Sequence, residues 1–141
     1  MIYDTEKVSR PRVLIADDLP EVHEKLRELL QDHFEIVDNA YDGEQAIEAA
    51  TTLNPDVLIL DISMPFLNGM QVASRLRKTA CKAKIIFFTV REDQDYVDAA
   101  FSTGALGYVL KPRLTTDLIP AIDEALQGRR FISDCAVRGI D

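Results

Sequence analysis

The chain has 141 residues, of which 24 are acidic and 16 basic, giving a formal net charge of −8. A chain of this length fits one domain with a sizeable apolar core. Its acidic balance disfavours direct binding to nucleic acid or another polyanion. No apolar run approaches the roughly 18 residues that a membrane-spanning helix needs, and the N-terminus lacks the pattern of a secretory leader. We therefore expect a cytoplasmic protein without membrane contact.

Strand and helix patterns alternate along the chain from Arg12 onward. Continuous apolar runs favour strands buried on both faces, and apolar residues spaced by three or four favour helices that pack on a sheet. We expect strands at residues 12–17, 34–37, 56–61, 84–89 and 107–110, and helices at about 20–32, 43–53, 70–80, 92–103 and 116–127.

Some helix ends carry local signals. Asp42 followed by Gln45 predicts a capping box. Asn54 before Pro55 predicts a helix end, because the residue before proline avoids the helical region. Pro120 is compatible with the last helix only in its first turn, since a proline further along removes a backbone hydrogen bond.

The alternation predicts an α/β fold of the (βα)₅ type. Right-handed crossovers would place helices on both faces of a doubly wound, five-stranded parallel sheet. We expect the domain to cover residues 11–128. Residues 1–10 are expected to be a flexible tail, and residues 129–141 a C-terminal tail or the start of a linker to an output domain outside this chain.

Polar residues follow four of the predicted strands. They are Asp17 and Asp18 after the first strand, Asp61 after the third, Thr89 after the fourth and Lys111 after the fifth. Ligands of open α/β sheets bind beyond the carboxyl ends of the strands, so these five side chains are expected at one edge. Together they suit the handling of a phosphoryl group.

Each of these residues also has a simpler explanation. Asp18 with Glu21 resembles a helix cap, and Asp61 fits the start of a turn. Thr89 fits a packing residue at the end of a strand, and Lys111 fits a solvated lysine. Three neighbouring carboxylates repel one another, however, and Mg²⁺ bound by carboxylate oxygens would offset that repulsion. Asp61 is the candidate nucleophile, because an aspartate can form an acyl phosphate. Thr89 and Lys111 are candidate partners of the phosphoryl oxygens.

The order of these residues resembles the receiver domain of bacterial response regulators in two-component signalling, over roughly residues 11–131. The most specific segments are Val13-Leu14-Ile15-Ala16-Asp17-Asp18, Leu60-Asp61-Ile62-Ser63-Met64-Pro65, Asn68-Gly69, Thr89 and Gly107-Tyr108-Val109-Leu110-Lys111-Pro112. The resemblance implies a flavodoxin/CheY-like sheet with strand order 2-1-3-4-5.

The resemblance also implies roles for the site. Asp61 would accept a phosphoryl group from a phosphohistidine of a sensor histidine kinase. Mg²⁺ would be held by Asp17, Asp18, Asp61 and the main-chain carbonyl of Ser63. Such a protein is not an enzyme in the ordinary sense, because it takes part only in its own phosphorylation and slow dephosphorylation.

Further implied roles concern the response to phosphorylation. Thr89 and Lys111 would contact the phosphoryl oxygens, and the Lys111–Pro112 peptide would be cis. Thr89 and Tyr108 would switch the face formed by the predicted helix 92–103, strand 107–110 and helix 116–127, which is also a possible homodimer surface. Ser63 and Arg91 would influence the lifetime of the phosphoryl group.

Two further segments resemble the LuxR/NarL-type subfamily. They are Phe101-Ser102-Thr103-Gly104-Ala105-Leu106-Gly107-Tyr108-Val109-Leu110-Lys111 and Gly128-Arg129-Arg130-Phe131-Ile132-Ser133. The resemblance implies control of transcription, with DNA contacted only through a DNA-binding domain outside this chain. One alternative is a stand-alone receiver that acts by protein–protein interaction or phosphorelay. A more remote one is a dehalogenase-like phosphatase, which combines similar residues in a different order.

Overall fold

The computed structural model describes residues 10–134, so the expected N-terminal tail lies outside the described residues except for Arg10. The elements, in chain order, are β1 (Arg12–Ala16), α2 (Pro20–Leu30), β2 (Glu35–Ala40), α3 (Gly43–Leu53), β3 (Val57–Leu60), α4 (Gly69–Leu76), β4 (Lys84–Thr89), α5 (Gln94–Ser102), β5 (Gly107–Leu110), the short 3₁₀ helix η1 (Lys111–Arg113), α6 (Leu114–Leu126) and β6 (Phe131–Ile132). Within the described range, none of the helices has the length and apolar character that crossing a membrane requires.

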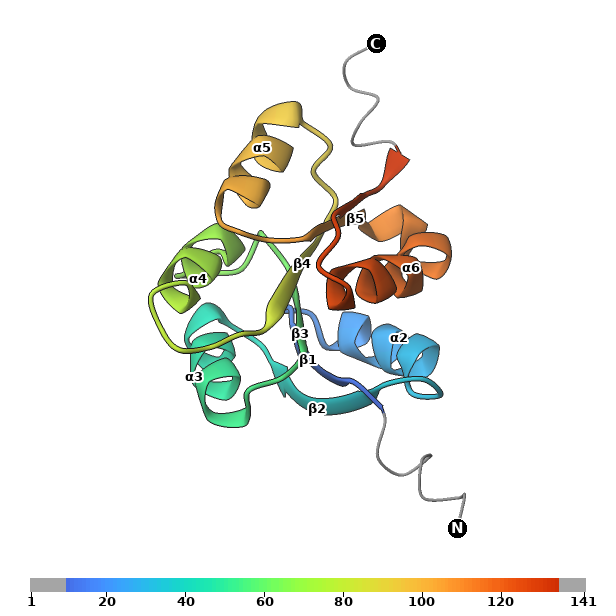
Figure 1. Cartoon of the computed structure of the whole chain (residues 1–141), viewed down its shortest axis with the longest axis horizontal. Coiled ribbons are helices and arrows are strands. Elements are labelled where there is room, and N and C mark those ends of the chain that lie inside the picture. The colour runs from blue at the N-terminus through green and yellow to red at the C-terminus, as the bar shows by residue number, and fades with distance from the viewer. Residues whose placement is uncertain (1–9, 135–141) are drawn as a thin grey trace.

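The strands form one parallel sheet in the order β2-β1-β3-β4-β5-β6. Helices α2 and α6 lie on one face of the sheet, and α3, α4 and α5 lie on the other (Figure 1). The predicted doubly wound α/β class and the order of the first five strands are therefore confirmed.

The central strands are buried on both faces. On β1, Val13 and Ile15 belong to the apolar core beneath α2 and α6, whereas Leu14 and Ala16 belong to the core beneath α3, α4 and α5. This double burial explains why the strands read as continuous apolar runs rather than as alternating ones. Burial on both faces also holds the carboxyl ends of the central strands in place, and the polar residues of the predicted site lie at these ends.

The sixth strand, β6, was not expected from the sequence. It pairs with β5 in parallel, and its ladder includes the Phe131 N–H donating to the carbonyl of Leu106 and the Ser133 N–H donating to that of Tyr108, both at 2.9 Å. A strand of two residues is too short to show a hydrophobic period. The five-strand prediction therefore missed it, and residues 131–132 are part of the sheet.

The ends of α3 follow the sequence signals in part. The Asp42 side chain accepts a hydrogen bond from the Gln45 N–H at 2.8 Å, which confirms Asp42 as the N-cap. The Gln45 side chain accepts from the N–H of Tyr41 rather than from that of Asp42, so the capping box is incomplete. Asn54 adopts a left-handed conformation with φ of 47° just before Pro55, and α3 ends there as predicted.

Helix α6 begins earlier than the sequence predicted. It starts at Leu114, so Pro120 lies inside the helix, and the prediction that this proline occupies the first turn is wrong. Proline has no N–H to donate to the carbonyl of Thr116, four residues earlier. Both residues are exposed, so water can satisfy that carbonyl.

Candidate functional site

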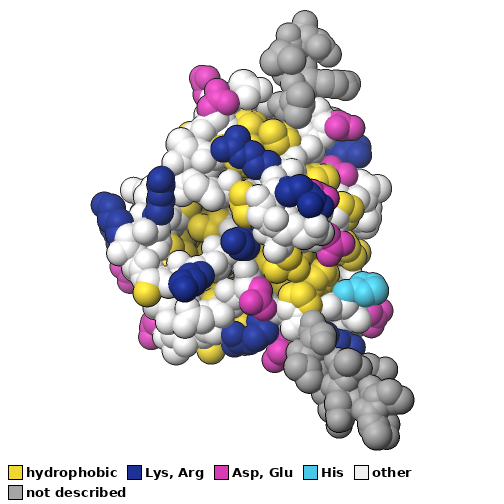
Figure 2. All heavy atoms as spheres, in the orientation of Figure 1, with side chains coloured by type: hydrophobic (Ala, Val, Ile, Leu, Met, Phe, Trp, Pro, Cys, Tyr) yellow, Lys and Arg dark blue, Asp and Glu magenta, His cyan; other side chains and the backbone are white. Residues whose placement is uncertain are grey.

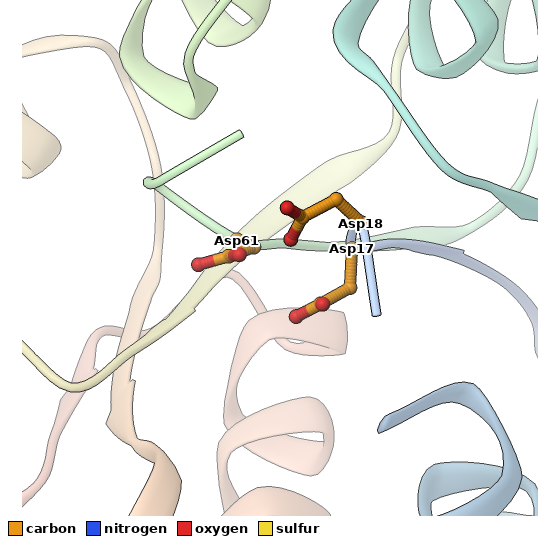
Figure 3. A group of neighbouring side chains, drawn as sticks. All are labelled: Asp17, Asp18 and Asp61. Carbon is orange, nitrogen blue, oxygen red and sulfur yellow. The ribbon is translucent and has the colours of Figure 1, made fainter. Parts of the chain in front are cut away.

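Three carboxylates converge at the carboxyl edge of the sheet (Figure 3). Asp17 and Asp18 follow β1, Asp61 follows β3, and one oxygen from each lies within 4.8 Å of the others. Asp17 and Asp61 are buried, whereas Asp18 is partly exposed. The structure thus brings together the three acidic residues whose convergence the strand ends predicted.

The backbone fixes Asp61 at the end of β3. Its N–H donates to the carbonyl of Ala16 at 2.9 Å, which carries the β1–β3 pairing one residue further. Its own carbonyl lies against Gly69, the first residue of α4, where an added Cβ would overlap that oxygen. Glycine therefore lets α4 begin directly on the backbone of Asp61.

The Asp61 carboxylate has few partners for a buried charge. Its Oδ1 accepts a hydrogen bond from the Ser63 N–H at 3.2 Å, and its Oδ2 lies 3.6 Å from the Lys111 Nζ. Burial has the largest effect on the pKa of Asp61 and repulsion from Asp17 the second largest. Both raise the pKa, and they outweigh the lowering effects of Lys111 and the Ser63 amide. Together with a smaller effect of Asp18, these influences raise the pKa of Asp61 from 3.8 to about 6. The site is therefore short of positive charge.

Lys111 supplies a positive charge to the cluster. Its Nζ lies 2.9 Å from Oδ2 of Asp17 as well as 3.6 Å from Asp61. Oδ1 of Asp17 accepts a hydrogen bond from the Leu19 N–H at 2.9 Å. Oδ2 of Asp17 is buried and receives no hydrogen bond of good geometry, although it is close enough to Lys111 for an ion pair. This oxygen has unused capacity for a cation.

Asp18 does not serve as the cap of α2. The N-cap residue is Leu19, and no side chain donates or accepts a capping hydrogen bond there. The capping alternative for Asp18 and Glu21 is therefore not observed. The Asp18 carboxylate instead lies beside the other two acidic side chains (Figure 3).

Thr89 and Tyr108 are connected through the backbone of Arg91. The buried Thr89 hydroxyl oxygen accepts a hydrogen bond from the Arg91 N–H at 3.1 Å, and the Tyr108 hydroxyl donates to the Arg91 carbonyl at 2.8 Å. Burial raises the pKa of Tyr108, so its hydroxyl remains a donor at neutral pH. The Arg91 guanidinium stacks on Tyr96, with Cζ 4.4 Å from the ring centroid. Thr89 is thus at the expected strand end, with its hydroxyl bonded to the β4–α5 loop.

The prediction of a cis peptide between Lys111 and Pro112 is wrong. No peptide bond within residues 10–134 is cis. Lys111, Pro112 and Arg113 form η1, which leads into α6. The fixed φ of proline suits the first positions of a helical turn, and the trans isomer is the more stable form before proline.

The acidic cluster fits a divalent cation bound through oxygen. Asp17 has a buried oxygen without a hydrogen bond, Asp18 is not used as a cap, and the pKa of Asp61 is raised by burial and by repulsion from Asp17. Mg²⁺ prefers such carboxylate oxygens and keeps several waters. The Ser63 N–H bonds to Asp61, which holds the Ser63 peptide beside the cluster, and its carbonyl as a further ligand stays a prediction.

An apolar groove borders the site between α2 and α6. It has a volume of about 250 Å³, and its lining includes Val22, Leu26, Phe88, Leu114 and Lys111. Apolar side chains are visible at the surface between these two helices (Figure 2). The groove therefore offers an apolar contact surface next to the ammonium group that faces the carboxylates.

Sequence reasoning missed two buried polar groups. His23 on α2 bonds to the carbonyl of Asp17, and Asp117 on α6 bonds to Ser133. His23 precedes Leu26 by three residues and shares its buried face. The available signal was a polar residue at a core position of an amphipathic helix.

Comparison with known proteins agrees with this geometry. The response regulator receiver domain family matches residues 13–123, and the chain belongs to this family. It is therefore a receiver of two-component signal transduction, a class whose members bind Mg²⁺ at an acidic cluster and are not ordinary enzymes.

Individual relatives place the chain more closely. It is 33% identical over 124 residues to the nitrate/nitrite response regulator protein NarL of Escherichia coli strain K12, covering 86% of this chain and 57% of NarL. It is 33% identical over 115 residues to the chemotaxis protein CheY of Halobacterium salinarum, covering 82% of this chain and 96% of CheY. A solved LuxR-family two-component response regulator from Aurantimonas sp. SI85-9A1 matches with a TM-score of 0.88 and 30% identity, covering 94% of this chain and 96% of that chain. The chain thus spans less than two-thirds of NarL.

Proposed function

We propose that Asp61 is the phospho-acceptor of this receiver and takes a phosphoryl group from a phosphohistidine of a sensor histidine kinase. The observation that carries the proposal is the position of Asp61, a buried carboxylate at a strand end that lies close to both Lys111 and the acidic pair Asp17 and Asp18. A carboxylate held in this way by the backbone is oriented before the donor arrives.

The proposed chemistry is an in-line displacement. A carboxylate oxygen of Asp61 attacks the phosphorus, the new O–P bond forms as the P–N bond of the donor breaks, and the electron pair stays on the donor's imidazole nitrogen. The product is an acyl phosphate. Lys111 complements the charge on the phosphoryl oxygens, which is the main need of such a transfer.

The Asp17, Asp18 and Asp61 carboxylates, with the Ser63 carbonyl, would hold Mg²⁺. When bound, the ion supplies the positive charge that Lys111 alone does not provide to the carboxylates and the incoming phosphoryl group. The need for this charge is supported by the three carboxylates lying together and by the pKa of Asp61, which is raised first by burial and then by repulsion from Asp17.

The response is proposed to begin at Thr89. Bonding of its hydroxyl to a phosphoryl oxygen would compete with the hydrogen bond from the Arg91 N–H. Because the Arg91 carbonyl also holds the Tyr108 hydroxyl, a shift of this peptide alters Tyr108 on β5. The α5–β5–α6 face would then change, and it is the proposed surface for a homodimer.

Ser63 and Arg91 are proposed to affect the lifetime of the phosphoryl group. Ser63 contacts Asp61 through its amide, and Arg91 contacts Thr89 through its amide. Each follows a proposed phosphoryl contact by two residues, and by the resemblance to other receivers the side chains at these positions would border the path of an attacking water. Its own phosphorylation and the slow loss of the group from Asp61 would be the only reactions in which the protein takes part.

The favoured output is transcription. The chain matches a LuxR-family response regulator, and NarL continues beyond the matched region. DNA would be contacted by a further domain outside this chain, while the receiver meets its kinase in the cytoplasm. The groove beside Lys111 suits a donor protein, because a partner lying there would have its phosphohistidine close to Asp61.

The test is Mg²⁺-dependent labelling. Incubation with Mg²⁺ and a small phosphodonor should add one phosphoryl group to the wild type and none to Asp61→Asn, as measured by intact-protein mass. Asp32→Asn is the control, because Asp32 is exposed and lies in the turn after α2. A wild type that stays unmodified with both a kinase and a small donor would contradict the proposal.

A stand-alone receiver is the second candidate, and the match to nearly all of CheY favours it. In that case the α5–β5–α6 face would bind a partner protein or the receiver would pass its phosphoryl group on. The full-length gene decides between the two: a helix-turn-helix segment after residue 141 supports transcriptional output, and a stop codon there supports the stand-alone form.

A further inference from the structure

His23 is buried directly behind the acidic cluster. It is 5% exposed and lies on α2, one turn after the acidic pair. Its Nε2–H donates to the main-chain carbonyl of Asp17 at 2.8 Å. With the proton on Nε2, Nδ1 is an acceptor, so it pairs with the Asn39 side chain on β2, 2.7 Å away, when the Asn39 amide turns its N–H₂ group towards the ring. Its ring packs on Tyr41 with 4.4 Å between the centroids. Both ring nitrogens are therefore used, which packing alone does not require.

The contact with His23 completes the fixing of Asp17. The Asp17 N–H donates to the carbonyl of Ala40 at 3.0 Å, and Oδ1 accepts from the Leu19 N–H at 2.9 Å. The Asp17 carbonyl lies beyond the last ladder pair of β1 with β3, which is Ala16 with Leu60, and it is bonded by His23. Oδ2 is the oxygen of Asp17 that faces the Lys111 ammonium, at 2.9 Å, and it accepts no hydrogen bond of good geometry.

The direction of that oxygen depends on the backbone of Asp17. A rotation of the Asp17 peptide would move the carboxylate relative to Asp61 and Lys111, because the side chain has only two rotatable bonds. The residue is 1% exposed, so water cannot replace a lost bond to its carbonyl. Among the contacts of the described residues, His23 on α2 is the one donor to this carbonyl.

We infer that His23 is a positioning residue, which fixes the Asp17 main chain and so directs Oδ2 of Asp17 towards the divalent cation. Asn39 orients the imidazole from the neighbouring strand. The inference rests on the proposed Mg²⁺-dependent function of the cluster. It adds an outer layer, formed by His23 and Asn39, that connects the metal-binding edge to α2 and β2.

The first experiment compares His23→Leu with His23→Gln in the full chain. Leucine fills the space without a donor, whereas glutamine can place an amide N–H near the position of Nε2. Mg²⁺ affinity, measured by titration calorimetry of the unphosphorylated protein, should weaken about 10-fold in His23→Leu. The affinity of His23→Gln should return most of the way to that of the wild type. His33→Leu is the matched control, because His33 is exposed.

A purely structural role predicts a different result. His23→Leu would then lower the free energy of unfolding without Mg²⁺ while the folded protein kept the wild-type Mg²⁺ affinity, and that result would overturn the inference. If His23→Leu does not fold, Asn39→Ala distinguishes a positioning role of His23 from a purely structural one. Asn39 is half-buried and its loss frees the imidazole, so a reduced Mg²⁺ affinity supports the inference and an unchanged one contradicts it.

A metal-free measurement separates this inference from the proposed function. Hydrogen exchange of the Leu19 amide, which donates to Oδ1 of Asp17, should be faster in His23→Leu without Mg²⁺. If the wild type binds no Mg²⁺ but this exchange changes, the positioning role stands and the proposed function fails. If the wild type binds Mg²⁺ and neither affinity nor exchange responds to His23, the positioning role alone fails.

Discussion

The protein holds two buried carboxylates in opposite ways. Asp117 on α6 is 7% exposed and accepts hydrogen bonds from Arg113, Thr116 and Ser133, the last at 2.7 Å. Asp61 is 4% exposed and has only the Ser63 amide at 3.2 Å and the Lys111 ammonium at 3.6 Å. The first carboxylate is satisfied as an anion within the protein, and the second is not.

The pKa values follow this difference. Burial alone would raise the pKa of Asp117, but hydrogen bonds from Arg113, Ser133 and Thr116 outweigh it and hold the pKa below the usual value. Burial and the repulsion of Asp17 raise the pKa of Asp61 to about 6. A buried acid with enough donors stabilises the fold, whereas a buried acid short of donors has capacity left for a ligand.

Removing the satisfied carboxylate should have the largest effect on stability. Asp117→Ala leaves the Arg113 guanidinium and the Ser133 hydroxyl without this partner, so we expect a loss of about 3 kcal/mol in the free energy of unfolding. Urea denaturation at pH 7 measures it. Asp123→Ala is the control, because Asp123 is exposed on the same helix and should change stability little. Equal effects of the two substitutions would contradict the comparison.

Removing the unsatisfied carboxylate of Asp61 should raise the free energy of unfolding rather than lower it. Because the folded-state pKa of Asp61 lies above its ordinary 3.8, the folded protein binds this proton more tightly than the unfolded chain does. Stability therefore falls as pH rises from about 4 to 6. Asp61→Asn should be more stable than the wild type by about 2 kcal/mol at pH 8 without Mg²⁺.

The stability advantage of Asp61→Asn over the wild type should be smaller at pH 4 and in the presence of Mg²⁺, because protonation of Asp61 or a bound cation relieves the same repulsion. Urea denaturation of both proteins at pH 4 and pH 8, with and without Mg²⁺, provides the measurement. A wild type more stable than Asp61→Asn at pH 8 without Mg²⁺ would show that Lys111 already compensates the charge.

The smallest expected effect concerns the bond between β6 and the satisfied carboxylate. The Ser133 hydroxyl donates to Asp117 and accepts from the Leu110 N–H at 3.1 Å. Ser133→Ala should lower the free energy of unfolding by about 1 kcal/mol and leave labelling of Asp61 by a phosphodonor unchanged. Ser102→Ala, at an exposed position of α5, is the control. Loss of labelling in Ser133→Ala would mean that the two carboxylate regions are coupled.

The sheet and most of the site were predictable from the chain because their signals are local. The run Val57-Leu58-Ile59-Leu60 is buried on both faces, and the acid that follows it must leave the core at the strand end. The same reasoning places Asp17 and Lys111. The residue types already suggested phosphoryl chemistry, and the family resemblance added the detailed roles, although it also led to the incorrect cis peptide before Pro112.

The features that were missed depend on contacts between distant segments. β6 exists because two residues pair with β5, and His23 acts through Asp17 and Asn39, which lie 6 and 16 residues away. The helical position of Pro120 depends on where η1 passes into α6. Helical periodicity places His23 on the buried face of α2, but it does not show which groups the imidazole contacts.

The sequence alone determined the α/β class, the order of the elements and the identity of the residues at the strand ends. These follow from hydrophobic periodicity, which is a property of neighbouring residues. Only the tertiary structure decided how well each buried charge is compensated, because donors for Asp117 and Asp61 come from several elements. That compensation separates a carboxylate that connects β6 with α6 from one to which we assign the binding of a cation and a phosphoryl group.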